Sequence, residues 1–282
     1  MKLGQLSLSR RTLTVAAACV AMVSLAIGAH AALNKRPMEV AKEADKAVVT
    51  DQGVLPATVS RVALIIGNGH YPDANHPLQQ PINDARDLGA ALRASGFDVD
   101  VVEDATRDDM SRAVERLKAK VGPDTVVMLF FGGFGVQAGR ESFMLPVDAA
   151  IWKEGDVRRD GISVEQVLGA MDEKGAKAKL VVLDASRRNP YERRFRSYSH
   201  GLAPISPPEN TLVISSATPG KVIDEPTVIN SVLVTELLSN LKTQPGIEAA
   251  FNKTRVSISR ASEGEQVPSV SSSLLEDIRL GG

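Results

Sequence analysis

The chain has 282 residues, of which 43% are hydrophobic and 24% are charged, a composition typical of a globular protein with one large core or two smaller ones. Its formal net charge is −1, so no overall electrostatic field favours nucleic acid or a membrane surface as a partner. Aromatic residues make up only 4% of the chain, which argues against a surface that stacks nucleic-acid bases.

Residues 1–31 have the three-part layout of a signal peptide. Basic residues precede a long apolar run, and the small-residue pattern Ala-His-Ala at positions 29–31 follows it. The chain is therefore predicted to be periplasmic or secreted, with a mature start at Ala32. Two alternatives stay open, because Arg10 and Arg11 also fit a twin-arginine signal, and the uncleaved apolar run is only slightly short of a membrane anchor.

The single cysteine, Cys19, lies inside this apolar run. Cleavage after residue 31 would leave a mature protein without a thiol, and hence without a disulfide or a thiolate nucleophile. Residues 32–60 are polar and mixed in charge, and we interpret them as a flexible linker. Residues 61–282 are predicted to form one domain.

Strand and helix patterns alternate from residue 61 onward. Apolar or alternating runs predict strands at 61–68, 97–104, 125–131, 179–186 and 211–217. Helical spacing predicts helices at 82–96, 106–121, 163–175 and 230–241, and another from 247 onward. The pairs Thr106 with Asp109 and Ser163 with Gln166 mark helix N-termini. Strands with two apolar faces, separated by helices, predict a mostly parallel sheet covered on both sides.

Three loops follow the predicted strands, at 67–69, 132–135 and 184–186. Ligands of parallel α/β sheets bind at the carboxyl ends of strands, so the chemistry is expected in these loops. A dinucleotide site is not predicted, because Pro72 stands where a third glycine would be needed.

No cofactor or metal ion is predicted from the sequence. His30 leaves with the signal peptide, and the other histidines, His70, His76 and His200, show no metal-ligand spacing. They are interpreted as exposed loop residues. No compact cluster of acidic residues indicates a calcium site.

The motifs occur in a defined order along the chain. IIGNGHYP begins at residue 65, LFFGGFG at 129, LVVLDASRRNP at 180 and INSVLVTELL at 229. Together they resemble the caspase–metacaspase superfamily of cysteine peptidases, in its bacterial branch, over roughly residues 61–280. The resemblance implies a caspase-like three-layer α/β/α sandwich with a mostly parallel central sheet, and a site with a catalytic histidine and cysteine.

Both catalytic positions of the family are replaced. Phe134 stands at the histidine position and Ser186 at the cysteine position, while Asp184, Ala185 and Arg187 keep the family pattern. A serine hydroxyl needs a positioned base to act as a nucleophile, and phenylalanine provides none. The leading prediction is therefore an inactive peptidase homologue. The alternative is a hydrolase that uses Ser186 with His70 or His200 as its base.

Two acidic residues match positions that bind a basic substrate side chain in metacaspase-like members. These are Asp84 and Asp184, and the resemblance implies a pocket for arginine or lysine. Two structural interpretations compete with this one. Asp184 would hydrogen-bond backbone amides of its own loop, and Asp84 would cap the helix that starts near Ile82.

The segment 186–201 carries five arginines. It is interpreted as a solvated loop, and the competing hypothesis is that Arg193, Arg194 or Arg196 occupies the acidic pocket as an internal plug. The predicted partner is a peptide or protein segment with Arg or Lys. A further alternative is a structural role, in which the chain pairs with an active peptidase homologue through a sheet edge. Nucleic acid is not predicted, and a membrane is contacted only through an uncleaved N-terminal segment.

Overall fold

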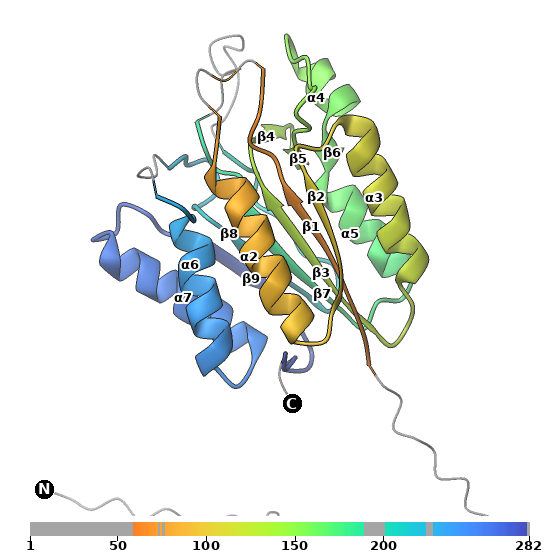
Figure 1. Ribbon diagram of the computed structural model, residues 1–282, viewed down its shortest axis with the longest axis vertical. Helices are drawn as coiled ribbons and strands as arrows, with labels where there is room; N and C mark the ends of the chain where they lie inside the picture. The colour runs from red at the N-terminus through yellow and green to blue at the C-terminus, as the bar shows by residue number, and fades with distance from the viewer. Residues whose placement is uncertain (1–58, 73, 75–76, 189–200, 224–227, 281–282) are drawn as a thin grey trace, which may run out of the picture. The chain divides into compact units, whose positions relative to one another are not determined.

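The computed structural model describes residues 59–72, 74, 77–188, 201–223 and 228–280 (Figure 1). All of them belong to the compact unit Val54–Gly282. The signal peptide, Cys19 and nearly all of the linker lie outside the described residues, and so do His76, His200, Arg193, Arg194 and Arg196.

A six-stranded sheet forms the centre of this unit, in the order β2-β1-β3-β7-β8-β9. The first five strands in this order are parallel, and β9 is antiparallel to β8. The strands are β1 (Ser60–Gly67), β2 (Asp98–Glu103), β3 (Thr125–Gly132), β7 (Ala178–Asp184), β8 (Thr211–Ser215) and β9 (Ser269–Ser272).

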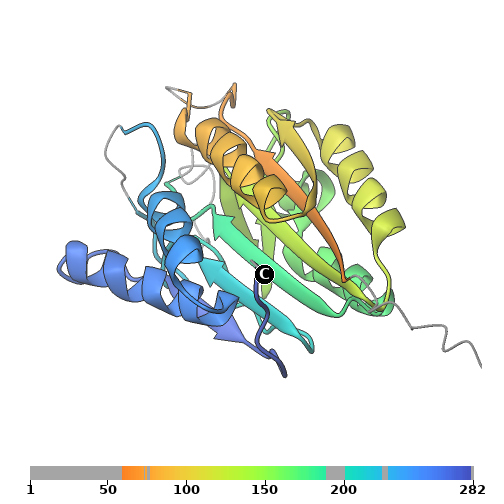
Figure 2. The same cartoon turned by 60° about the horizontal axis from the view of Figure 1, so that its bottom comes forward.

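Helices cover both faces of the sheet (Figures 1 and 2). One face carries α2 (Gln80–Ala94), α6 (Val232–Thr243) and α7 (Ile247–Ala261), and the other carries α3 (Arg107–Lys120) and α5 (Val164–Glu173). The predicted three-layer sandwich with a mostly parallel sheet is confirmed.

Successive side chains of each strand point to opposite faces of the sheet, so the sheet has a separate hydrophobic core on each face. In β3, Leu129 and Phe131 pack with α3 and α5, whereas Met128 and Phe130 pack with α2 and α6. All eight residues of β3 are buried, as expected for a central parallel strand. The long apolar runs of the sequence follow from this burial on both faces.

The two predicted helix N-termini are confirmed. Thr106 accepts from the amide of Asp109, whose side chain accepts from the amide of Thr106 in return, and together they form a capping box. The Ser163 hydroxyl accepts from the amide of Gln166 at the start of α5. Helix α2, however, begins at Gln80, two residues before the predicted start, with Pro81 in its first turn.

A second, three-stranded sheet was not predicted. It consists of β4 (Gly135–Ala138), β5 (Glu141–Met144) and β6 (Ile162–Ser163), paired antiparallel. Strands of two to four residues carry too little hydrophobic pattern to distinguish them from loops.

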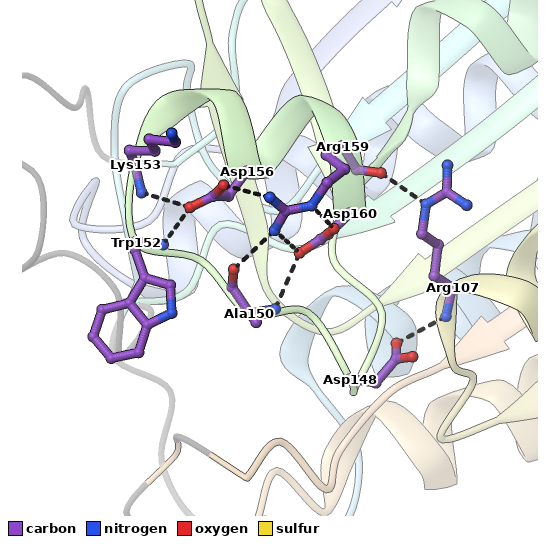
Figure 3. A network of polar contacts seen from close by, with 8 residues as sticks. All are labelled: Arg107, Asp148, Ala150, Trp152, Lys153, Asp156, Arg159 and Asp160. Atoms are coloured by element: carbon purple, nitrogen blue, oxygen red, sulfur yellow. Dashed lines mark hydrogen bonds and ion pairs between the residues drawn. The ribbon is translucent and has the colours of Figure 1, made fainter.

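The short helix α4 (Glu154–Asp160) was also not predicted. Polar contacts fix α4 to the turn before it and to the start of α3, as Figure 3 shows. Asp156 accepts from the amides of Trp152 and Lys153, and its other carboxylate oxygen accepts from Arg159, 2.7 Å away. Arg107 at the start of α3 donates to the carbonyl of Arg159 at 2.7 Å and so ties α4 to the main fold. Such tertiary contacts are not visible in the spacing of apolar residues.

Within the described residues, no helix combines the length and the apolar character needed to cross a bilayer.

Candidate functional site

The three loops predicted to carry the chemistry lie side by side at one edge of the sheet. The register pairs Gly67 with Gly132, and Gly132 with Asp184, so β1, β3 and β7 end at the same level. The expectation that these loops share the carboxyl edge is confirmed.

Backbone hydrogen bonds tie the β3 loop to the β7 loop. The amide of Gly133 donates to the carbonyl of Asp184 at 3.2 Å, and the amide of Gly135 donates to the carbonyl of Ala185 at 3.0 Å. A Cβ atom at Gly135 would lie 2.9 Å from the Cβ of Ala185, so only glycine allows this approach. These contacts hold residue 134 beside residues 185 and 186.

Phe134 is a core residue in this arrangement. Its side chain is 4% exposed, and its ring centroid lies 4.6 Å from that of Tyr71. The Tyr71 hydroxyl accepts from the amide of Phe134 at 3.1 Å and donates to the carbonyl of Leu145 at 2.9 Å. The position therefore supplies packing, and it offers neither a lone pair nor a proton for catalysis.

Ser186 lies two residues after the end of β7 and is 1% exposed. Its carbonyl accepts from the amide of Ile223 at 2.8 Å, which joins the β7 loop to the segment after β8. No metal-binding group of three or more His, Cys, Asp or Glu side chains occurs among the described residues.

The described part of the chain places no histidine beside Ser186. His70 is an exposed loop residue, as predicted, and its Nδ1 lies 2.6 Å from Oδ2 of Asp104 at the end of β2. Strand β3 lies between β1 and β7, so the loop that carries His70 is two strands, roughly 10 Å, from the loop that carries Ser186. This geometry does not support His70 as a base for Ser186. His200 lies outside the described residues.

Asp84 is completely buried in α2. Its Oδ1 accepts from the amide of Ser231 at 3.0 Å, and Ser231 is the N-cap residue of α6. The interpretation that Asp84 caps its own helix is wrong, because α2 begins at Gln80 and has no side-chain cap hydrogen bond. Asp84 instead joins the start of α6 to α2.

Asp184 is also completely buried, and its partner is a cation. Its Oδ2 lies 2.8 Å from Nη2 of Arg187, whose Nη1 donates to the carbonyl of the same aspartate. The interpretation that loop amides hold this carboxylate is not borne out among the described residues. The spacing Asp-x-x-Arg was visible in the sequence, but only the path of the loop shows that Arg187 folds back onto Asp184.

The two carboxyl groups share one electrostatic environment. The pKa of Asp84 is raised from 3.8 to about 7, first by burial and second by the negative charge of Asp184. The hydrogen bonds from Ser231 and the positive charge of Arg187 oppose this shift of the pKa. The site therefore holds one carboxylate neutralised by Arg187 and a second carboxyl group that changes charge near neutral pH.

Comparison with known proteins gives a family match. The caspase-domain family model matches residues 60–279. The human mucosa-associated lymphoid tissue lymphoma translocation protein 1 is 32% identical over 151 residues, which cover 52% of this chain and 17% of the human protein. The mouse homolog is 32% identical over 140 residues, which cover 49% of this chain and 16% of the mouse protein.

The family match agrees with the fold. The matched region is about a sixth of the length of either relative, so it compares one domain rather than whole proteins. Because the family model covers most of the sequence, this chain belongs to the caspase-domain family of cysteine peptidases.

Proposed function

We propose that this chain is an exported, catalytically inactive caspase-like domain that binds a basic side chain of a peptide or protein. One observation carries the proposal. Asp84 and Asp184 are completely buried, and each has one carboxylate oxygen with no hydrogen-bond partner among the described residues. Buried acceptors of this kind are rare unless a ligand or water satisfies them. Two carboxyl groups in one place suit a positively charged ligand.

The proposal of inactivity rests on Phe134 and Ser186. Peptide cleavage in this family needs a nucleophile beside a group that accepts and returns a proton. Phe134 packs against Tyr71 and exchanges no proton, and no described histidine lies near Ser186. Loss of the catalytic members of a peptidase site lowers turnover by on the order of a million-fold.

Binding of basic peptides tests the proposal. The full-length chain is expected to bind peptides that end in Arg or Lys without cleaving them. Asp84→Asn and Asp184→Asn should each weaken binding by about tenfold or more, because a charged hydrogen bond to the ligand is lost. Asp87→Asn is the matched control, since Asp87 is an exposed acid on the same helix. Binding can be measured by calorimetry and cleavage with fluorogenic peptides.

Three outcomes would contradict this assignment. Turnover that Ser186→Ala abolishes would establish a serine hydrolase instead. Binding that the aspartate variants leave unchanged would place the ligand elsewhere. Absence of peptide binding, together with a stable complex with an active family member, would favour a purely structural role. Export is tested separately, by fractionation of cells and sequencing of the mature N-terminus.

Restoring the family dyad tests whether the scaffold still supports catalysis. Phe134→His with Ser186→Cys is expected to give weak cleavage after basic residues, because the backbone already holds residue 134 beside the β7 loop. Each single variant should stay inactive, since the thiol and the imidazole act as a unit. Complete inactivity of the folded double variant would show that the site lacks more than these two groups.

A further inference from the structure

Three buried side-chain atoms have no hydrogen-bond partner in the part of the chain that the structure describes. They are Oδ2 of Asp84, Oδ1 of Asp184 and Oγ of Ser216. All three residues are completely inaccessible to solvent. Buried polar groups without hydrogen-bond partners destabilise a fold and are rare in native structures. Three such groups therefore indicate a site that a ligand or water can satisfy.

The register places Ser216 beside Asp184. Leu183 of β7 pairs with Ser215 of β8, and the amide of Ser216 donates to the carbonyl of Leu183 at 2.9 Å, which extends the pairing by one step. Side chains alternate between the two faces of a strand. Leu183 and Ala185 pack in the core under α3 and α5, so the side chain of Asp184 points to the opposite face.

Ser216 points to the same face as Asp184. Leu212 and Ile214 of β8 pack in the core under α2 and α6, and Ser216 continues this alternation. Helices α2 and α6 cover this face (Figure 1). Asp84, near the start of α2, accepts from the amide of Ser231, the N-cap residue of α6. The three unpartnered oxygens therefore lie on one face of the sheet, at its carboxyl edge and beside the first turns of α2 and α6.

In each carboxylate, one of the two oxygens already has a hydrogen-bond partner. Oδ2 of Asp184 already pairs with Arg187, and Oδ1 of Asp84 already accepts from the amide of Ser231. A guanidinium group binds most strongly when two parallel N–H groups meet the two oxygens of one carboxylate. At both aspartates a guanidinium of the ligand would have to share one of these oxygens with a donor that is already bound there, which is Arg187 at Asp184 and the amide of Ser231 at Asp84.

Single oxygens from three different residues match an ammonium group. A lysine side chain ends in three N–H donors on one compact nitrogen, so each donor can meet one acceptor. The charge also matches. Arg187 neutralises Asp184, and the ionised form of Asp84 leaves one negative charge for one incoming cation.

We infer that Oδ2 of Asp84, Oδ1 of Asp184 and Oγ of Ser216 together bind a primary ammonium group, so that the pocket prefers lysine to arginine. This inference rests on the proposed function and adds to it the choice of side chain, with Ser216 as the residue that sets the preference. Because all three residues are buried, the ligand must displace the chain that covers them, and association is expected to be slower than for a preformed open site.

The experiment compares two peptides that differ only in a final lysine or arginine, titrated into the full-length chain by calorimetry. The lysine peptide is expected to bind about tenfold more tightly. Ser216→Ala should weaken lysine binding about tenfold and change arginine binding less than about twofold. Ser215→Ala is the matched control, because this neighbouring serine alternates to the other face, and it should leave both affinities unchanged.

The outcomes separate this inference from the proposed function. The lysine preference would be wrong if the arginine peptide bound equally or more tightly, or if Ser216→Ala weakened the binding of both peptides by the same factor. Either result would leave the proposed pocket for basic side chains intact. Absence of binding by both peptides would overturn the proposed function and the inference with it. Ser216→Ala is expected to fold normally, because it removes a buried hydroxyl that has no partner to lose.

Discussion

Arg187→Ala is expected to lower the free energy of unfolding by about 3–5 kcal/mol, the range for removal of one partner from a buried ion pair. Arg187 is 5% exposed and Asp184 is completely buried, with 2.8 Å between Nη2 and Oδ2. Without the guanidinium, Asp184 would remain buried beside Asp84 and would lose the cation with which it pairs. Chemical denaturation with urea measures the difference directly.

Arg116→Ala is the control for this experiment. Arg116 pairs with Asp100 at 2.7 Å, but its side chain is 51% exposed, and pairs of that kind contribute about 0–1 kcal/mol. If Arg187→Ala lowers the free energy of unfolding no more than Arg116→Ala does, water reaches the Asp184–Arg187 pair in solution. If Arg187→Ala lowers the free energy of unfolding much more, while Arg116→Ala has almost no effect on it, the result supports the buried geometry. It also supports the role of Arg187 as a permanent counter-ion of the site.

The structure explains which parts of the fold the sequence could predict. Strands β1, β3 and β7 are continuous apolar runs because they are buried on both faces, and α3 and α5 begin at side-chain caps that the sequence displays. Both kinds of signal are local. The loops between them could be located at the carboxyl edge because parallel strands end together. The replacements at positions 134 and 186 were visible only through the resemblance to a family.

Contacts between distant segments could not be predicted. One of the two interpretations of Asp84 was a helix cap, which followed from a predicted start of α2 that was two residues late. Its hydrogen-bond partner in the structure, Ser231, is 147 residues away along the chain. The sequence did not mark Ser216 as a site residue, because a serine after a strand is common. That its hydroxyl has no hydrogen-bond partner among the described residues follows only from the fold. The small sheet and α4 likewise depend on tertiary polar contacts, such as the one between Arg107 and the carbonyl of Arg159.

Stability is expected to fall as pH rises from about 4 to about 7, with Asp84 as the main cause. The pKa of Asp84 is about 7 in the folded chain against 3.8 in the unfolded chain. Between these values the unfolded state gives up a proton that the folded state keeps, so each rise in pH favours unfolding. Above about pH 7 Asp84 is ionised in both the folded and the unfolded state, so the loss of stability stays constant. The difference of about three pKa units corresponds to on the order of 4 kcal/mol.

Asp84→Asn is expected to remove most of this pH dependence, because the amide does not ionise. Unfolding by urea at about pH 5 and about pH 8 measures it, and Asp87→Asn should keep the behaviour of the unmodified chain, since Asp87 is exposed on the same helix. Full pH dependence in Asp84→Asn would assign the effect to another group. In the ionised pocket Arg187 faces two negative charges, and a bound ammonium group would balance the second. A lysine peptide should therefore bind more tightly as pH rises through about 7, and this gain should be absent from Asp84→Asn.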